Sequence, residues 1–294
     1  MNEHDHEHGR EGNIKIAFFL NLFFTILEII GGLWTNSMAI LSDALHDLGD
    51  SISLGMAWYF EKYSQKGPDE FFSFGYARFS LLGALINSMV LIIGSILVLS
   101  RSIPRIFQPE SVNAEGMLVF AILGIAINGL AAIRLRKGTS LNEKVVSWHL
   151  LEDVLGWIAV LAVSIALLFI DLPILDPILS ILITLFVLFN VIKNIKAVMH
   201  VFLQGVPKKY SIGEIEDQIR KVSGVVSVYH THIWSLEGEK NQLTTHIIVD
   251  DLISRDDIIS MKKEIQEAVR QSGIEHVTIQ VDYQGEEADT SVTD

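Results

Sequence analysis

The fold of this chain is decided by the stretch SDALHDLGD, residues 42–50. It lies inside an apolar run from Ala39 to about Trp58, which is long enough to cross a bilayer. On a helix, His46 and Asp50 lie one turn apart and point the same way. Ionisable residues near the centre of a membrane helix cost at least roughly 2.5–3.5 kcal/mol each, so this pair needs a compensating partner.

A second pair with the same spacing, His149 and Asp153, opens another apolar run. Two imidazoles and two carboxylates form a good tetrahedral ligand set for Zn²⁺. The two ionised carboxylates also cancel the double charge of the ion in a low-dielectric setting. Without metal, the same carboxylates are expected to retain protons, so metal binding releases protons. The two pairs therefore predict a site that exchanges a divalent metal for protons.

Spacing alone leaves the choice of ligands open. Asp43 and Asp47 lie near the same helical stripe as the first pair, and Glu152 neighbours the second. Glu28, in the first apolar run, either lines the same polar cavity or is a structural carboxylate. The alternative to metal is an interhelical polar network. A single pair on a soluble helix would favour that network, whereas two pairs inside membrane spans favour metal.

The composition is typical of a polytopic membrane protein. Half of the 294 residues are hydrophobic, and the formal net charge is −13, which argues against a nucleic-acid partner. The chain has no cysteine, which excludes disulfides and thiolate ligands. The N-terminal residues are polar and acidic, unlike a cleavable signal peptide.

Six apolar runs, each of about twenty residues or more, predict six transmembrane helices. They cover residues 14–34, 39–58, 79–99, 112–133, 145–170 and 174–198. Lysine and arginine gather on the side of both termini, so we expect both termini in the cytoplasm. The predicted divisions are a His- and acid-rich cytosolic tail at 1–12, a transport domain at 13–203, a cytosolic domain at 206–284 and a disordered tail at 285–294.

The cytosolic domain is predicted to be a two-layer α+β domain with the order α-β-β-α-β. Helical periodicity covers 211–222 and 255–271, and alternation covers 225–234, 243–249 and 276–283. Strict alternation in the first strand places five side chains on one face. These are Val226, Val228, His230, His232 and Trp234.

The chain resembles the cation diffusion facilitator family, close to its zinc and cadmium exporters. The resemblance covers residues 14–283 and is carried by the six spans, the α-β-β-α-β domain and three motifs. The motifs are SDALH at 42–46, His149-x-x-x-Asp153 and HTHIWSL at 230–236. In that family the transport site joins the second and fifth spans, and homodimers exchange a divalent metal for protons by alternating access. The resemblance thus selects His46, Asp50, His149 and Asp153.

The resemblance also implies metal ligands in the cytosolic domain. The matching positions are His230, His246 and Asp282, and His232 is a substitute on the same strand face as His230. Surface or structural histidines are the alternative interpretation. Zn²⁺ would then be both the transported substrate and a regulatory ligand, with no organic cofactor.

This chain departs from the family pattern in the loop between the second and third spans. Phe72 and Tyr76 stand where some relatives carry histidines, so we predict that the extra metal site of those relatives is absent. Arg78 is followed by Phe79 where relatives carry a basic-acidic pair, so a charge contact made by relatives is expected to be missing.

Ligand type ranks Zn²⁺ first and Cd²⁺ next, followed by Co²⁺, Ni²⁺ and Fe²⁺. An intramembrane zinc protease would be expected to show H-E-x-x-H, which this sequence lacks, so we expect no enzyme. The alternatives are a membrane-bound metal sensor or scaffold with little transport, and an exporter of organic cations. The short loops favour a bacterial cytoplasmic (inner) membrane.

Overall fold

The computed structural model describes residues 3–64, 66–136 and 141–284, with side chains inside 3–17, 57–58, 61–62, 64, 135–136 and 141–149 left out of the description. The predicted tail at 285–294 and the side chain of His149 therefore lie outside the described part. The chain divides into two compact units. The membrane unit comprises Met1–Lys62 and Leu82–Ile195, and the C-terminal unit comprises Tyr63–Leu81 and Lys196–Asp294.

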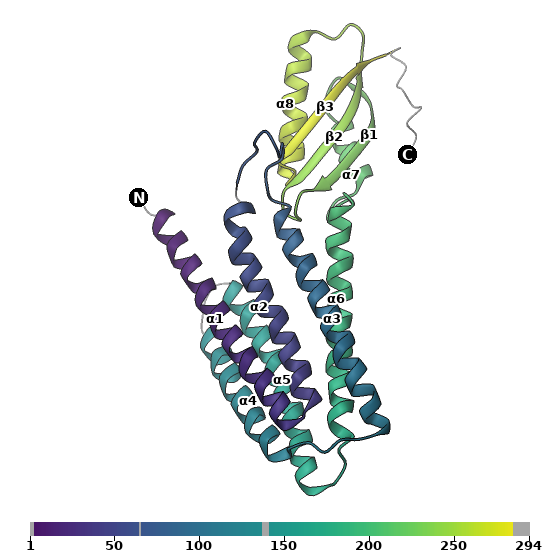
Figure 1. The fold of residues 1–294 in the computed structure, drawn as a ribbon. Helices are drawn as coiled ribbons and strands as arrows, with labels where there is room; N and C mark the ends of the chain where they lie inside the picture. Colours follow the sequence, from purple (N-terminus) through teal and green to yellow (C-terminus); the bar gives the residue numbers. More distant parts are fainter. Residues whose placement is uncertain (1–2, 65, 137–140, 285–294) are drawn as a thin grey trace. The chain divides into compact units, whose positions relative to one another are not determined.

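Six long helices account for the apolar runs (Figure 1). They are α1 (Glu3–Thr35), α2 (Met38–Ser64), α3 (Phe79–Phe107), α4 (Ala114–Arg136), α5 (Leu141–Phe169) and α6 (Leu175–Phe202). Within the described residues, five are long and apolar enough to cross a membrane, and α2, which carries the acidic stretch, is not among them. This count is compatible with six spans, but the sixth stays a prediction.

The turn between α1 and α2 is held by a buried carboxylate from α6. Asn36, with φ of 55°, ends α1 in the left-handed region. Asp176 accepts hydrogen bonds from Ser37 Oγ at 2.5 Å and from the next two backbone N–H groups at 2.7 and 3.2 Å. These are donors that a helix N-terminus leaves without intrahelical partners. Asp176 thereby fixes the start of the helix that carries His46.

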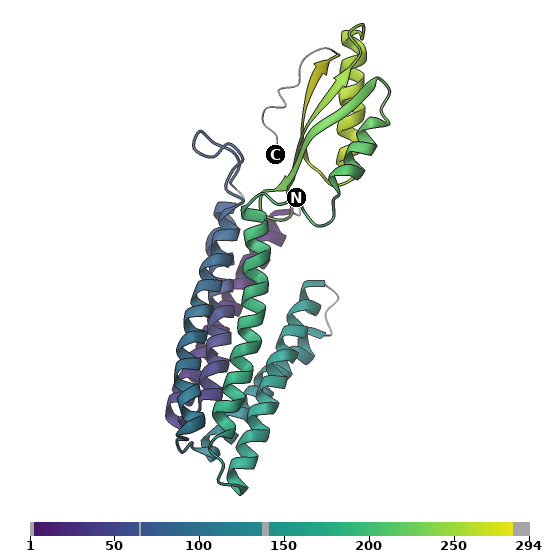
Figure 2. The same cartoon turned by 90° about the vertical axis from the view of Figure 1, so that its right-hand side faces the viewer.

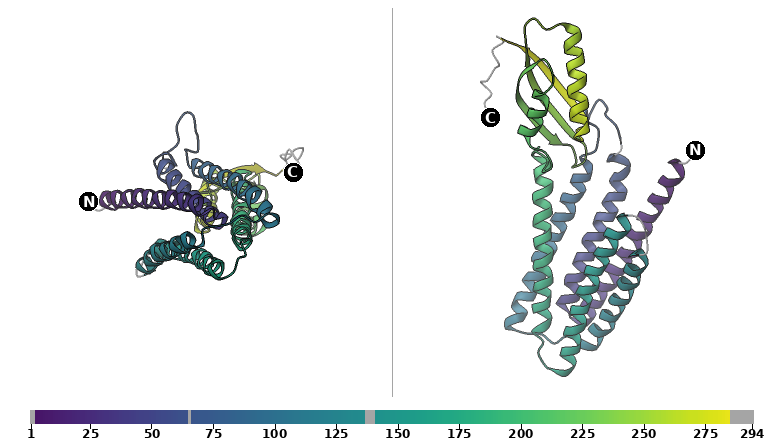
Figure 3. Two further views of the ribbon diagram at one scale, coloured as in Figure 1. Left: turned by 60° about the horizontal axis from the view of Figure 1, so that its bottom comes forward. Right: turned by 180° about the vertical axis from the view of Figure 1, so that it is seen from behind.

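Helices α4 and α5 pack as a close pair, visible side by side in Figures 2 and 3. Trp157 of α5 is fully buried against Gly124 of α4, where an added Cβ would lie 2.2 Å from the indole. Large apolar side chains point outward instead, including Phe23, Leu130 and Phe189, each more than half exposed. A buried aromatic interior with an apolar exterior is the arrangement expected of a helix bundle in lipid.

The C-terminal unit contains a three-stranded sheet covered on one face by two helices (Figure 2). Its elements are α7 (Ile212–Arg220), β1 (Val225–Ser235), β2 (Asn241–Val249), α8 (Arg255–Gln271) and β3 (His276–Tyr283). β2 is central, antiparallel to β1 and parallel to β3. The core between helices and sheet includes Ile219, Leu243, Ile247 and Ile265, all fully buried. The predicted α-β-β-α-β order and two-layer class are confirmed for this domain.

The prediction of strict alternation along β1 is wrong. Val228 is buried in the core, whereas His230 and His232 are exposed on the opposite face. The register with β2 shifts between Tyr229 and His232, and His230 has φ of 52° at this point. A bulge therefore inserts one residue and reverses the phase of the strand.

Candidate metal sites

On α2, the first His/Asp pair lies as helical spacing predicts. His46 Nε2 is 3.8 Å from Asp50 Oδ2, and both side chains are partly exposed. This separation is too long for a hydrogen bond. It is close to the distance of about 3.3 Å that separates two donors bound to one tetrahedral Zn²⁺.

The second helix of the predicted site meets the first at His46. Its Nε2 lies 3.8 Å from Oδ1 of Asp153 on α5, whose side chain is 8% exposed. Two of the four predicted ligands, Asp50 and Asp153, thus each lie 3.8 Å from a third, His46. The side chain of the fourth, His149, lies outside the described part. Among the residues searched, no three His, Asp or Glu side chains close around a point that an ion would occupy.

A cavity of about 450 Å³ opens beside these residues. Its polar end is formed by Asp43, His46, Glu152 and Asp153, and its apolar wall comes mainly from α6. The wall residues are Leu155, Gly156, Leu182, Ile183, Phe186 and Val187. A polar end on an otherwise apolar cavity places the carboxylates within reach of a small ion and of water.

Further carboxylates surround the pair. Asp43 and Asp47 are each 5% exposed, and Glu28 of α1 is fully buried beside them. Sequence spacing identified both aspartates as neighbours of the ligand stripe, but only the packing of α1 against α2 shows that Glu28 joins them. The structure therefore supports the interpretation that Glu28 belongs to the polar interior of the site.

The positive charge that would balance these carboxylates is missing from the sequence of the helices. No lysine or arginine occurs between residues 16 and 61, nor between 145 and 192. Several carboxylates buried without a fixed cation are costly unless they hold protons or a bound cation. The site is therefore suited to exchange protons for a bound cation.

In the C-terminal unit, the predicted ligands gather on the sheet face that the helices leave open. The ring of His230 lies 4.8 Å from that of His232 and 5.2 Å from that of His246. His246 Nδ1 is 3.0 Å from Asp282 Oδ2. The bulge in β1 is what places His230 on this face.

Asp282 is the centre of a hydrogen-bond network on this face. It accepts hydrogen bonds from the Tyr229 hydroxyl at 2.5 Å and from Gln280 Nε2 at 3.0 Å. Burial opposes ionisation, but the bonds from Tyr229, Gln280 and His246 outweigh it and hold the pKa of the Asp282 carboxyl below its ordinary value. Sequence reasoning missed Tyr229. Its register partner on β2 is His246, so a correct strand pairing would have pointed to it.

The loop between α2 and α3 is organised by Asp69. Its carboxylate accepts hydrogen bonds from Lys66 Nζ at 2.7 Å, from the Tyr76 hydroxyl at 2.8 Å and from two backbone N–H groups. Lys66 and Tyr76 hold the pKa of the Asp69 carboxyl well below its usual range. The Phe72 ring lies 4.6 Å from the Tyr76 ring, so these two positions form an aromatic pair. The predicted absence of a metal site in this loop stays a prediction.

Two family models match the two parts of the chain. Residues 14–203 match the family model of the cation efflux transmembrane domain, and residues 207–284 match that of the cation efflux protein cytoplasmic domain. The chain belongs to the cation efflux family. The resemblance predicted from the motifs is confirmed, and this cation efflux protein is an integral membrane protein with apolar spanning helices.

Curated relatives match almost the whole chain. It is 34% identical to the "Cadmium, cobalt and zinc/H(+)-K(+) antiporter" of Bacillus velezensis, over 98% of this chain and 95% of that protein. It is also 34% identical to the "Metal cation efflux system protein CzcD" of Cupriavidus metallidurans, over 94% and 88% respectively. The "Zinc transporter ZitB" of Escherichia coli is 31% identical, over 96% and 91%.

One similar solved structure is the metal-bound C-terminal domain of the CzcD transporter. It is 31% identical and covers 25% of this chain and 99% of that one, with a TM-score of 0.23.

Proposed function

We propose that this cation efflux protein exports a divalent transition metal from the cytoplasm in exchange for protons, by alternating access. The proposed ligands are His46 and Asp50 of α2 with His149 and Asp153 of α5, in a tetrahedral set. The observation that carries the proposal is the position of His46, 3.8 Å from a carboxylate on its own helix and 3.8 Å from one on α5. No fixed cation is present in the sequence of either helix at this depth.

Charge balance explains why the proposed cycle exchanges metal for protons. With a divalent ion bound, two ionised aspartates and two neutral imidazoles make the loaded site formally neutral. When the ion leaves, the carboxylates take up protons, because several buried anions close together repel one another. Metal and protons thus occupy the same site in turn. The cavity beside His46 and Asp153 provides room for water and the ion to approach.

Zn²⁺ is the proposed substrate, with Cd²⁺ next, since two imidazoles and two carboxylates suit borderline metals. The printed names of the relatives, which include zinc, cadmium and cobalt, support this range. We also propose a homodimer in a bacterial cytoplasmic membrane with both termini in the cytoplasm.

A regulatory metal site is proposed on the open face of the C-terminal sheet, with His230, His232, His246 and Asp282 as donors. The ring distances near 5 Å among the histidines support it. His246 contacts Asp282 through Nδ1, so its Nε2 is the nitrogen that would bind the metal, with Asp282 orienting the ring. Zn²⁺ titration of the full-length protein with and without His246→Ala tests this second site.

The transport proposal is tested by Zn²⁺ flux into proteoliposomes with an imposed pH gradient. We expect gradient-driven flux in the wild type and its loss in Asp50→Ala and Asp153→Ala. Flux that survives both substitutions would contradict the assignment of the ligands. Bound Zn²⁺ without any flux would favour the alternative, a membrane-bound metal sensor or scaffold.

A further inference from the structure

The C-terminal unit contains another cavity, of about 280 Å³, and none of the proposed metal ligands lines it. One wall is the loop between α2 and α3, which contributes Phe71–Gly75, Ala77 and Arg78. The other wall is formed by Gln204, which follows α6, and by Trp234 and Leu236 at the end of β1. Drug-sized ligands occupy pockets of about 300–1,000 Å³, so this cavity suits a smaller group.

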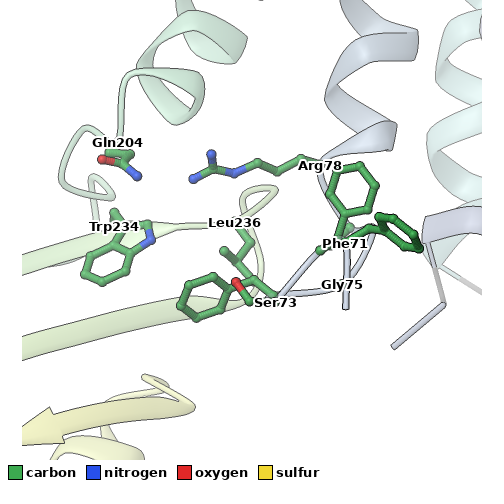
Figure 4. Close-up of a pocket in the computed structure, with 10 residues that line it drawn as sticks. Phe71, Ser73, Gly75, Arg78, Gln204, Trp234 and Leu236 are labelled. Carbon is green, nitrogen blue, oxygen red and sulfur yellow. The ribbon is translucent and has the colours of Figure 1, made fainter. Parts of the chain in front are cut away.

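The charged group in this cavity is the guanidinium of Arg78. Figure 4 shows it extending across the cavity towards Gln204. Its Nε is buried without a hydrogen-bond partner among the described residues, and none of them forms an ion pair with it. The described residues that line the cavity include no aspartate or glutamate.

The other polar groups of the cavity are also donors. Gln204 contributes a side-chain amide and Trp234 an indole N–H, both facing the same space as Arg78 (Figure 4). An arginine fork with additional N–H donors is the usual protein arrangement for a phosphate group, which accepts two parallel hydrogen bonds. A cation without an ion pair among the described residues, in a cavity lined by donors and by no described acid, therefore points to an anionic ligand.

Two residues of the cavity adjoin the ends of apolar helices in the sequence. Arg78 directly precedes α3 and Gln204 follows the end of α6, both apolar spanning helices. Trp234 and Leu236 lie in the part that matches the model of the cytoplasmic domain, so a lipid that reaches the cavity would come from the cytoplasmic leaflet. Phe71, Phe72 and Phe74 of the same loop are exposed by 86%, 45% and 51%. Exposed aromatic rings beside a basic pocket are typical of a protein surface in contact with lipid headgroups.

We propose that this cavity binds the phosphate of an anionic phospholipid from the cytoplasmic leaflet. Arg78 holds the phosphate, Gln204 and Trp234 donate to it, and the phenylalanines of the loop contact the lipid beneath. Because Arg78 belongs to the loop and Trp234 to β1, the bound headgroup links the loop to the cytoplasmic domain. A soluble phosphate compound offers the same chemistry, and the absence of an apolar tail distinguishes it.

The test is native mass spectrometry of the detergent-solubilised full-length protein, titrated with phosphatidylglycerol or phosphatidylcholine. We expect phosphatidylglycerol to bind roughly tenfold or more tightly, because the choline ammonium of phosphatidylcholine cancels the charge of its phosphate and is repelled by Arg78. Arg78→Gln is expected to remove this preference, and Arg78→Lys to retain part of it, because the charge remains but the fork is lost. Lys208→Gln, which removes a positive charge four residues after Gln204 that does not line the cavity, is the matched control and should keep the preference.

Two results would overturn the proposal. One is an undiminished preference for phosphatidylglycerol in Arg78→Gln, since the preference would then come from another part of the surface. The other is competition by millimolar inorganic phosphate or glycerol phosphate that fully displaces the lipid, which would identify a soluble phosphate as the ligand. The unfolding temperature of each variant in phosphatidylcholine verifies that it is folded. None of these measurements depends on metal transport, so they stand apart from the test of the proposed function.

Discussion

Ser37 Oγ lies 2.5 Å from Asp176 Oδ1, in a buried hydrogen bond that joins the start of α2 to the first turn of α6. The same carboxylate accepts two backbone N–H groups at the α2 N-terminus, where the helix dipole also favours a negative charge. The position of α2, which carries the proposed ligands His46 and Asp50, is therefore set by a carboxylate that lies outside the proposed site.

Asp176→Ala should destabilise the membrane unit by about 3 kcal/mol or more, because it leaves buried donors without partners. The measurement is thermal unfolding of the purified protein in detergent. Ser164→Ala is the control, since Ser164 is equally buried but donates only to Leu161 O within its own helix. Equal losses in the two variants would contradict the role assigned to Asp176.

Substitutions of Asp153 and Glu152 test which of these two adjacent carboxylates is a metal ligand. Asp153→Asn is expected to lower Zn²⁺ flux by about a hundredfold, because it replaces an anionic donor by a weaker neutral one and removes a charge that balances the ion. Glu152→Gln changes the adjacent carboxylate in the same cavity and should keep flux within about threefold. If Glu152→Gln proved the more damaging variant, the ligand would be Glu152 rather than Asp153.

The absence of a side chain at Gly124 leaves room for the indole of Trp157. Gly124→Ala should lower the unfolding temperature, because its Cβ would overlap Trp157, a clash that typically costs about 1–3 kcal/mol. Gly129→Ala in the same helix meets only Val154 Cγ2 at 3.9 Å and should be neutral or stabilising. A compensating Trp157→Phe change should recover part of the loss in Gly124→Ala. No recovery would mean that the clash is elsewhere.

The hydrogen bonds to Asp282 make the stability of the C-terminal unit depend on pH. Its pKa is lowered in the folded state, so its stabilising contribution is fully present above the unfolded value of about 3.9 and is lost as pH falls through the folded value. Asp282→Asn should therefore reduce the free energy of unfolding at neutral pH and flatten its decline below about pH 4. Chemical unfolding of both proteins at several pH values measures this. A parallel decline in the variant would show that other carboxylates cause the acid sensitivity.

Local periodicity was enough to predict most of the fold. The helix at 255–271 and the strand at 276–283 begin and end where the structure has them. Spacing also predicted that His46 and Asp50 share a helical face, because that relationship depends only on the helix repeat. The association of α2 with α5 came from the family resemblance, and the approach of His46 to Asp153 agrees with it.

Long-range packing and strand irregularities could not be read from the sequence. The bulge at His230 has no signal in a residue pattern that alternates smoothly, so the phase of Val228 was predicted incorrectly. The cap provided by Asp176 joins residues 139 positions apart, and no local rule connects them. The burial of Glu28 likewise depends on how α1 packs, which periodicity leaves undetermined.

Trp234 has a practical consequence beyond the cavity that it lines. It is the single tryptophan in residues 63–81 and 196–294, while the other four of the chain lie in the membrane unit. With those four replaced by phenylalanine, the intrinsic fluorescence of the protein would come from one indole, placed where the α2–α3 loop, the end of α6 and β1 meet. The C-terminal unit thus carries its own optical reporter, and changes in its surroundings can be followed in real time without an added dye.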